Sequence, residues 1–184
     1  FTELVLTGIH LTSYGRDFTP RQTLLDAIRA VQDVPGVRRI RLGSLEPTVA
    51  TVEFAQALRT MDKVCPQFHL ALQSGSDTVL QRMARRYNMR MYRQAMENLR
   101  AVYPMAAFTT DVLTGFPGET EAEFEETRDF IREARYAKIH VFPYSQREGT
   151  KAAVMPGQLS NAEKERRARL LICLLYTSPS PRDS

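Results

Sequence analysis

Short apolar runs and helical apolar stripes alternate along the chain. Runs typical of buried strands cover residues 3–7, 37–42, 68–72, 108–113 and 138–142. Between the first two runs, Leu24, Ile28 and Val31 recur at the spacing of one helical face. Similar stripes predict helices around 54–61, over 77–85, 89–102 and 120–134, and after 160. Strands and helices that alternate at intervals of roughly 30–40 residues predict an α/β fold with a parallel sheet.

The pattern favours a parallel (β/α) barrel, or part of one, over a doubly wound sheet. No G-x-G-x-x-G follows the first predicted strand, and that motif marks the doubly wound dinucleotide-binding fold. The chain begins with Phe1 and enters a strand almost at once. We therefore expect a partial barrel that is truncated at its N-terminus.

Three capping boxes predict where helices begin. In this motif a Ser or Thr is followed three residues later by Glu or Gln, and the two side chains satisfy free backbone amides. The pairs are Thr19 with Gln22, Thr120 with Glu123, and Ser160 with Glu163. Pro20 suits the first helical position, which supports a helix start at Thr19.

Residues with ligand-binding chemistry follow the predicted strands. In a parallel barrel the loops at the carboxyl ends of the strands carry the site. These loops hold Gly8, Ser44, Glu46, Gln73, Ser74, Gly115 and Ser145. Residues 111–119 run from a strand through a glycine-rich turn to a capped helix, and such a turn offers bare backbone amides to a ligand. The alternative is that these are ordinary turn residues.

Composition adds little to this picture. The chain has 184 residues, 43% of them apolar and 25% charged, which is enough for one globular domain with a core. Of its 25 basic residues only four are lysine; arginine suits phosphate recognition, but a GC-rich genome produces the same bias.

We expect no membrane segment, because no apolar run approaches the roughly 18 residues required. The Ser- and Pro-rich residues 174–184 predict a disordered, non-native tail behind a 1–173 core domain.

Five segments together resemble the radical SAM methylthiotransferases, which add a methylthio group to tRNA or to a ribosomal protein. They read LTGIH at 6–10, RIRLGSLEP at 39–47, FHLALQSGSD at 68–77, DVLTGFPGET at 111–120 and YSQREGT at 144–150. The segment 42–47, with Cys65-Pro66 and residues 140–145, is most similar to the branch that modifies threonylcarbamoyl-adenosine beside the anticodon. The branches that modify isopentenyl-adenosine or a ribosomal protein remain alternatives, as do another radical SAM enzyme and a non-catalytic RNA-binding barrel.

The resemblance implies an enzyme that uses S-adenosyl-L-methionine and 4Fe-4S clusters. The family's C-x-x-x-C-x-x-C motif, which holds the catalytic cluster, is absent here and lies upstream in relatives. We therefore expect no metal ligand in this chain, no identifiable catalytic residue, and no activity from the chain alone. Cys65 and Cys173 are too far apart to form a local cluster and are expected to be reduced, as in the cytoplasm.

By the same resemblance, ten residues bind S-adenosyl-L-methionine: Thr7, Gly8, Ser44, Glu46, Gln73, Ser74, Arg85, Gly115, Phe142 and Ser145. Gln73 suits ribose hydroxyls because an amide both donates and accepts hydrogen bonds. Arg85 suits the methionine carboxylate through a bidentate fork, although a surface helix arginine is the alternative. Glu119 is either a binding acid or a charge that favours the start of a helix.

The implied macromolecular partner is tRNA, and the implied state is a cytoplasmic monomer; the sulfur donor stays open. Asp111, Arg41 and Arg86 are expected to contact substrate or RNA, and a solvated helix face is the alternative for the arginine group that includes Arg86. His10, His69 and His140 share no spacing and are expected to be core or surface residues rather than ligands.

Overall fold

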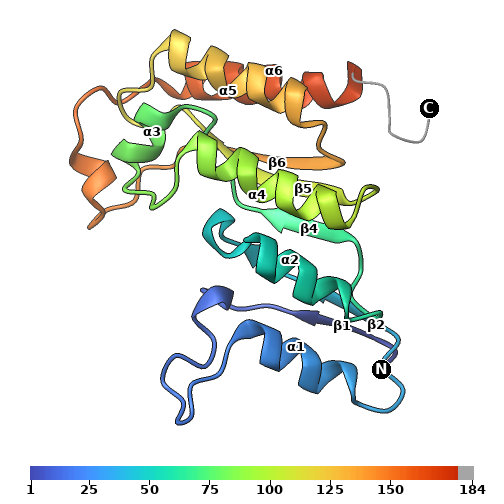
Figure 1. The fold of residues 1–184 in the computed structure, drawn as a ribbon. Helices are drawn as coiled ribbons and strands as arrows, with labels where there is room; N and C mark the ends of the chain where they lie inside the picture. Colours follow the sequence, from blue (N-terminus) through green and yellow to red (C-terminus); the bar gives the residue numbers. More distant parts are fainter. Residues whose placement is uncertain (178–184) are drawn as a thin grey trace. The chain divides into compact units, whose positions relative to one another are not determined.

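The computed structural model describes residues 1–177, and the predicted tail residues 178–184 lie outside that part (Figure 1). The strands are β1 (Glu3–Leu6), β2 (Arg39–Leu42), β3 (Ser44–Leu45), β4 (Gln67–Leu70), β5 (Ala107–Thr114) and β6 (Lys138–Pro143). The α-helices are α1 (Leu24–Gln32), α2 (Val52–Arg59), α3 (Asp77–Arg82), α4 (Met89–Val102), α5 (Glu121–Ala134) and α6 (Asn161–Thr177). Short 3-10 helices cover Leu11–Ser13, Pro47–Val49 and Lys151–Val154.

The chain divides into two compact units. The first contains residues 1–71 and 90–108. In it β1 pairs in parallel with β2, and β3 pairs in parallel with β4. Ile40, Leu45 and Phe68 alternate with polar positions along these strands and are fully buried, so one sheet face forms the core that the helices of this unit cover.

The second unit contains residues 72–89 and those from 109 onward. β5 and β6 pair in parallel from Thr109 with Lys138 to Thr114 with Pro143. Along β5 the buried residues alternate strictly with half-buried ones, as expected for a strand with one face in the core. Gln73 adds an isolated parallel bridge to Val112, which brings the chain after β4 alongside β5.

Most predicted elements are confirmed, and the cap of α5 is confirmed in detail. Thr120 is its N-cap and forms the reciprocal capping box with Glu123. The last helix begins after Ser160, whose Oγ accepts from the Glu163 amide at 3.2 Å.

The predicted start of the first helix is wrong. Its N-cap is Thr23 rather than Thr19, and the capping box uses Asp26. The amide of Gln22 donates to the Gly15 carbonyl at 3.1 Å and closes a loop, so Gln22 does not serve as a cap partner.

Two further differences concern segments predicted to be irregular. Residues 44–45 form the short strand β3, and α6 runs to Thr177, so residues 174–177 are helical.

Candidate functional site

The glycine-rich turn after β5 is the best-defined feature of the second unit. Gly115 and Gly118 both have positive φ, 72° and 75°. The amide of Gly115 donates to Glu119 Oε2 at 2.7 Å, and the amide of Gly118 donates to the Gly157 carbonyl at 2.8 Å. The Glu119 amide donates to the Phe116 carbonyl. The expectation of bare amides is therefore wrong for these three donors, because they bond within the chain.

Close approaches explain the glycine at position 115 of this turn and the glycine at position 157, which packs against the turn. A Cβ at position 115 would lie 2.4 Å from Cγ of Lys164, on α6. A Cβ at position 157 would lie 3.0 Å from Cα of Gly118. Positive φ is a conformation that side chains disfavour, so sterics and backbone geometry both require glycine at position 115.

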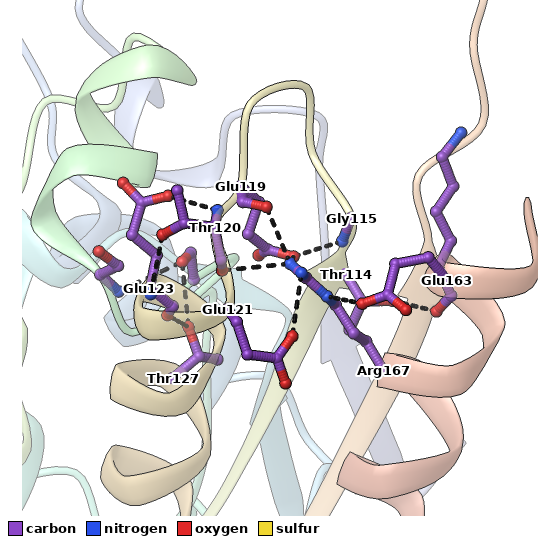
Figure 2. Close-up of polar contacts among 12 residues, drawn as sticks. Thr114, Gly115, Glu119, Thr120, Glu121, Glu123, Thr127, Glu163 and Arg167 are labelled. Carbon is purple, nitrogen blue, oxygen red and sulfur yellow. Dashed lines mark hydrogen bonds and ion pairs between the residues drawn. The ribbon is translucent and has the colours of Figure 1, made fainter. Parts of the chain in front are cut away.

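Glu119 and Arg167 form a buried ion pair beneath the turn (Figure 2). Their side chains are 1% and 5% exposed, and Nη1 of Arg167 lies 2.7 Å from Oε2 of Glu119. Burial raises the pKa of Glu119, and bonds from Arg167 and the Gly115 amide oppose that rise. Desolvation disfavours the Arg167 charge, but its bonds to Glu119 and Glu163 outweigh it and its pKa is raised. Glu119 thus bonds the turn and α6, an arrangement that neither sequence interpretation describes.

Glu123 joins the start of α5 to α3. Its carboxylate accepts from both Nη atoms of Arg82, at 2.9 and 2.7 Å, and from the Thr120 amide. The Arg82 hydrogen bonds, with those of Thr78 and Thr120, lower the pKa of Glu123 to about 2. The sequence predicted the capping bond between Glu123 and Thr120. It gave no sign of the ion pair between Glu123 and Arg82.

Gln73 and Ser74 lie beside β5. Gln73 has φ 64°, and its amide and carbonyl pair with the carbonyl of Asp111 and the amide of Leu113. Ser74 is fully buried; its Oγ lies 3.2 Å from Thr127 Oγ1 and accepts from the amide of Ser76. Gln73 is thus held at the carboxyl edge by its backbone, whereas the Ser74 hydroxyl is bonded inside the unit. That either side chain reaches a ribose stays a prediction.

The other predicted site residues of this unit lie on its surface or on the strands. Arg85, Arg86 and Ser145 are exposed. Phe142 is 51% exposed, and its ring stacks against His140 with centroids 6.5 Å apart. Asp111 is half-buried and stands opposite His140 in the β5–β6 register.

The carboxyl edge of the first unit carries a contact between a histidine and a carboxylate that the sequence interpretation missed. Thr7, Gly8 and Ser44 are exposed there. Nε2 of His10, after β1, lies 3.0 Å from Oε1 of Glu46, after β3, and both side chains are about two-fifths exposed. Nδ1 of His10 bonds the hydroxyls of Thr12 and Ser13. His10 and Glu46 are far apart in the sequence. Their positions after predicted parallel strands placed both at the same sheet edge, but no pattern predicted that they touch.

Arg41 lies on the sheet face of the first unit that points away from its helices. Its Nε lies 2.7 Å from Glu3, and its Nη1 donates to Gln67 at 3.1 Å. Glu3 also pairs with Arg39 at 2.8 Å. One carboxylate therefore serves two arginines. A separate cavity of about 480 Å³ in this unit lies between the start of α2 and the first turns of α4, and none of the predicted site residues lines it.

Comparison with known families decides the affiliation. Residues 8–131 match the family model described as the Radical SAM superfamily. The chain belongs to the radical SAM superfamily.

The curated relatives of this radical SAM chain include tRNA-modifying enzymes of two kinds. It is 42% identical over 174 residues to the threonylcarbamoyladenosine tRNA methylthiotransferase MtaB of Bacillus subtilis, which covers 95% of this chain and 39% of that protein. It is 43% identical over 170 residues to the tRNA-2-methylthio-N(6)-dimethylallyladenosine synthase of Acidothermus cellulolyticus, covering 92% of this chain and 34% of that protein. The radical SAM chain therefore spans between a third and two-fifths of these relatives.

Solved structures with little sequence identity to this chain share its fold. Coproporphyrinogen III oxidase HemN from Escherichia coli matches 95% of this chain and 40% of its own at TM-score 0.73 and 14% identity. The archaeal Elp3 of Methanocaldococcus infernus matches 96% of this chain and 45% of its own at TM-score 0.61 and 13% identity. These matches confirm the predicted class, an α/β chain that forms part of a parallel barrel of the radical SAM type.

The donor set of this radical SAM chain does not fit an iron–sulfur cluster. Within residues 1–177, no group of three or more His, Cys, Asp or Glu side chains is placed to hold a metal ion. Thr7 and Ser44 present exposed hydroxyls at the carboxyl edge of the first unit, and the half-buried Glu46 carboxylate there contacts His10. In the described residues, no helix has both the length and the apolar character needed to cross a bilayer.

Proposed function

We propose that this chain is part of a methylthiotransferase that acts on threonylcarbamoyladenosine in tRNA, and that it works in the cytoplasm. Relatives with that activity in their names occur in Bacillus subtilis, Thermotoga maritima and Rickettsia prowazekii, at 42, 34 and 41% identity. Relatives named for dimethylallyladenosine are equally similar, at 39–43% identity. Identity therefore supports the enzyme class, and the choice of nucleoside needs a physical argument.

The observation that carries this choice is the contact between His10 Nε2 and the Glu46 carboxylate, at 3.0 Å. Threonylcarbamoyl groups carry a carboxylate, a hydroxyl and amide hydrogens, whereas a dimethylallyl group is pure hydrocarbon. A hydrocarbon placed over these half-exposed polar side chains removes their water without replacing the lost hydrogen bonds, at a cost of roughly 1–3 kcal/mol per polar group. The polar edge that His10 and Glu46 form therefore favours the threonylcarbamoyl substrate.

We further propose that the edge residues bind S-adenosyl-L-methionine. When bound to a reduced cluster, that cofactor supplies a carbon radical and later a methyl group. Thr7 and Ser44 offer hydroxyls for its polar groups. In the second unit, taken by itself, the exposed Arg85 suits a carboxylate and the turn at Gly115 offers backbone to an adenine ring. Because the turn amides already have partners, we assign to Gly115 a packing contact and no hydrogen bond from its amide.

The test is a pair of chimeric enzymes. Residues 3–173 replace the matching segment of the Bacillus subtilis relative in one and of the Acidothermus cellulolyticus relative in the other. Each host supplies the cluster ligands and the remaining domains. Each chimera is expressed in a strain that lacks both activities, and tRNA nucleosides are measured by mass spectrometry. We expect methylthiolated threonylcarbamoyladenosine from the first chimera.

Other outcomes would decide against the proposal. Methylthiolation of dimethylallyladenosine alone, by either chimera, would assign the chain to the second kind of relative. Two folded chimeras that bind tRNA without modifying it would favour the non-catalytic RNA-binding alternative.

A further inference from the structure

Three contacts from one C-terminal segment support the turn between β5 and α5. The carbonyl of Gly157 accepts from the Gly118 amide at 2.8 Å. The stem of Lys164 packs against Gly115, and its carbonyl accepts from the Thr114 hydroxyl at 3.2 Å. Arg167 bonds Glu119, which in turn accepts from the Gly115 amide. The segment 157–167 therefore contacts the turn at both of its positive-φ glycines.

Arg167 is fully engaged within the protein. Its Nη1 donates to Oε2 and the carbonyl of Glu119, its Nε donates to Glu163 at 2.7 Å, and its Nη2 donates to Glu121 at 3.2 Å. The guanidinium has few donors left for an outside anion, although arginine is a common phosphate ligand. This fork cannot be reproduced by the single ammonium of a lysine.

The charge of Glu119 depends on Arg167. A carboxylate that is 1% exposed is costly to leave uncompensated, and removal of its partner forces it to take up a proton or to move. In either case the Gly115 amide loses its charged acceptor. Gly115 then has no side chain to hold its backbone at φ 72°, since glycine populates both signs of φ readily.

We propose that Arg167 and Glu119 are positioning residues that fix the shape of the turn at Gly115, and so set the surface that the adenosyl group meets. The role in adenosyl binding rests on the proposed function above. The helix-dipole explanation for Glu119 accounts for its charge near the start of α5 but not for its bond to Gly115. A direct ligand role requires an accessible carboxylate, and that of Glu119 is buried between the turn and α6.

The first test uses the 184-residue chain and needs no cofactor. Amide hydrogen exchange and the ¹⁵N–¹H shift of Gly115 are measured in Arg167→Met and in Arg166→Met. Arg166 is the matched control, because it neighbours Arg167 and bonds the same Glu163 and Glu121 without reaching Glu119. We expect Gly115 exchange to become roughly hundredfold faster in Arg167→Met and to change by less than about threefold in Arg166→Met.

Milder variants keep the test decisive if Arg167→Met does not fold. Glu119→Gln retains the size of the side chain and loses its charge, and Arg167→Lys retains the charge and loses the fork. Both are expected to speed Gly115 exchange by roughly tenfold. The proposal would be overturned if the Gly115 amide exchanged only through global unfolding, and to the same extent, in all variants.

The second test separates this inference from the proposed function. In the Bacillus subtilis chimera, Arg167→Lys is expected to raise KM for S-adenosyl-L-methionine roughly tenfold and to leave kcat within about threefold. An unchanged KM together with faster Gly115 exchange would restrict Arg167 to a structural role and overturn the positioning role. An inactive unsubstituted chimera would count against the proposed function, while Gly115 exchange in the isolated chain would still report whether Arg167 fixes the turn.

Discussion

Arg82 and Glu123 form a two-point ion pair, in which each Nη atom of the arginine donates to a different carboxylate oxygen, at 2.9 and 2.7 Å. The pair connects α3 to the first turn of α5. Glu123 is also the capping residue of α5. One side chain therefore starts a helix and holds a second helix against it, so its ionisation state affects both local and tertiary structure.

This pair predicts a loss of stability in acid. The pKa of Glu123 is about 2 in the folded chain, below its ordinary value of 4.5. The stabilisation is fully present above pH 4.5 and is lost as the pH falls toward 2, because the folded state must then protonate a bonded carboxylate. Urea unfolding between pH 2 and 7 should show Glu123→Gln to be less stable than the parent at pH 7 by about 1–3 kcal/mol, with the gap closing in acid.

The control for this prediction is Glu126→Gln, an exposed position on the same helix. This variant should have a free energy of unfolding within about 0.5 kcal/mol of that of the parent at every pH. Some acid dependence should persist in Glu123→Gln, because Arg166 and Arg167 also lower the pKa of Glu163 to about 2. A gap for Glu123→Gln that is constant with pH would exclude ionisation as its cause.

Gly115→Ala should destabilise the chain by about 2–4 kcal/mol, since it adds a methyl group against Lys164 as well as strain at positive φ. Gly36→Ala is the matched control. Gly36 has φ 87° but nothing within 4 Å of a new Cβ. Gly36→Ala should therefore lower the stability only through backbone strain, by about 1 kcal/mol. Equal losses in chemical denaturation would show that the Lys164 contact is unimportant.

The sequence was sufficient where a local pattern determines structure. The capping box of Thr120 and Glu123 needs only residues three apart, and the apolar stripe of α1 placed Leu24 and Ile28 in the core. The helix start at Thr19 failed because Thr23 offers the same cap spacing four residues later. The choice between them depends on a bond from Gln22 to Gly15, which no propensity encodes.

The candidate site could be placed at a sheet edge, but its contacts could not. The Gly118 amide donates to Gly157, and the Glu119 carboxylate that accepts from the Gly115 amide is held by Arg167. Gly157 and Arg167 both lie far along the chain from the turn. The pair of His10 and Glu46 likewise joins two separate loops. A strand pattern predicts which loops share an edge, whereas the partners within that edge depend on three-dimensional packing.

Ser74 offers a direct test of one predicted site residue. Because its hydroxyl is buried against Thr127 and the Ser76 amide, Ser74→Ala should destabilise the ligand-free chain by about 1–2 kcal/mol. The exposed Ser145→Ala is the control, with an expected change below about 0.5 kcal/mol. Thermal and urea unfolding measure both. An unchanged stability for Ser74→Ala would show that the internal bonds of this hydroxyl contribute little to folding. That result would favour the ribose contact predicted from the sequence.

The His10–Glu46 pair predicts a selective effect on substrate use. In the Bacillus subtilis chimera, Glu46→Gln removes the carboxylate that lies 3.0 Å from Nε2 of His10 and so weakens the orientation of that ring. If the pair bonds the threonylcarbamoyl group, KM for the tRNA carrying that group should rise roughly tenfold, the loss expected for a charged hydrogen bond. Glu53→Gln, an exposed change on α2 in the same unit, should leave KM unaltered. Steady-state methylthiolation of tRNA with and without the threonylcarbamoyl group separates the outcomes. A rise in KM for both tRNAs would assign the pair to general RNA or cofactor binding, and no rise would remove the physical argument for the threonylcarbamoyl substrate.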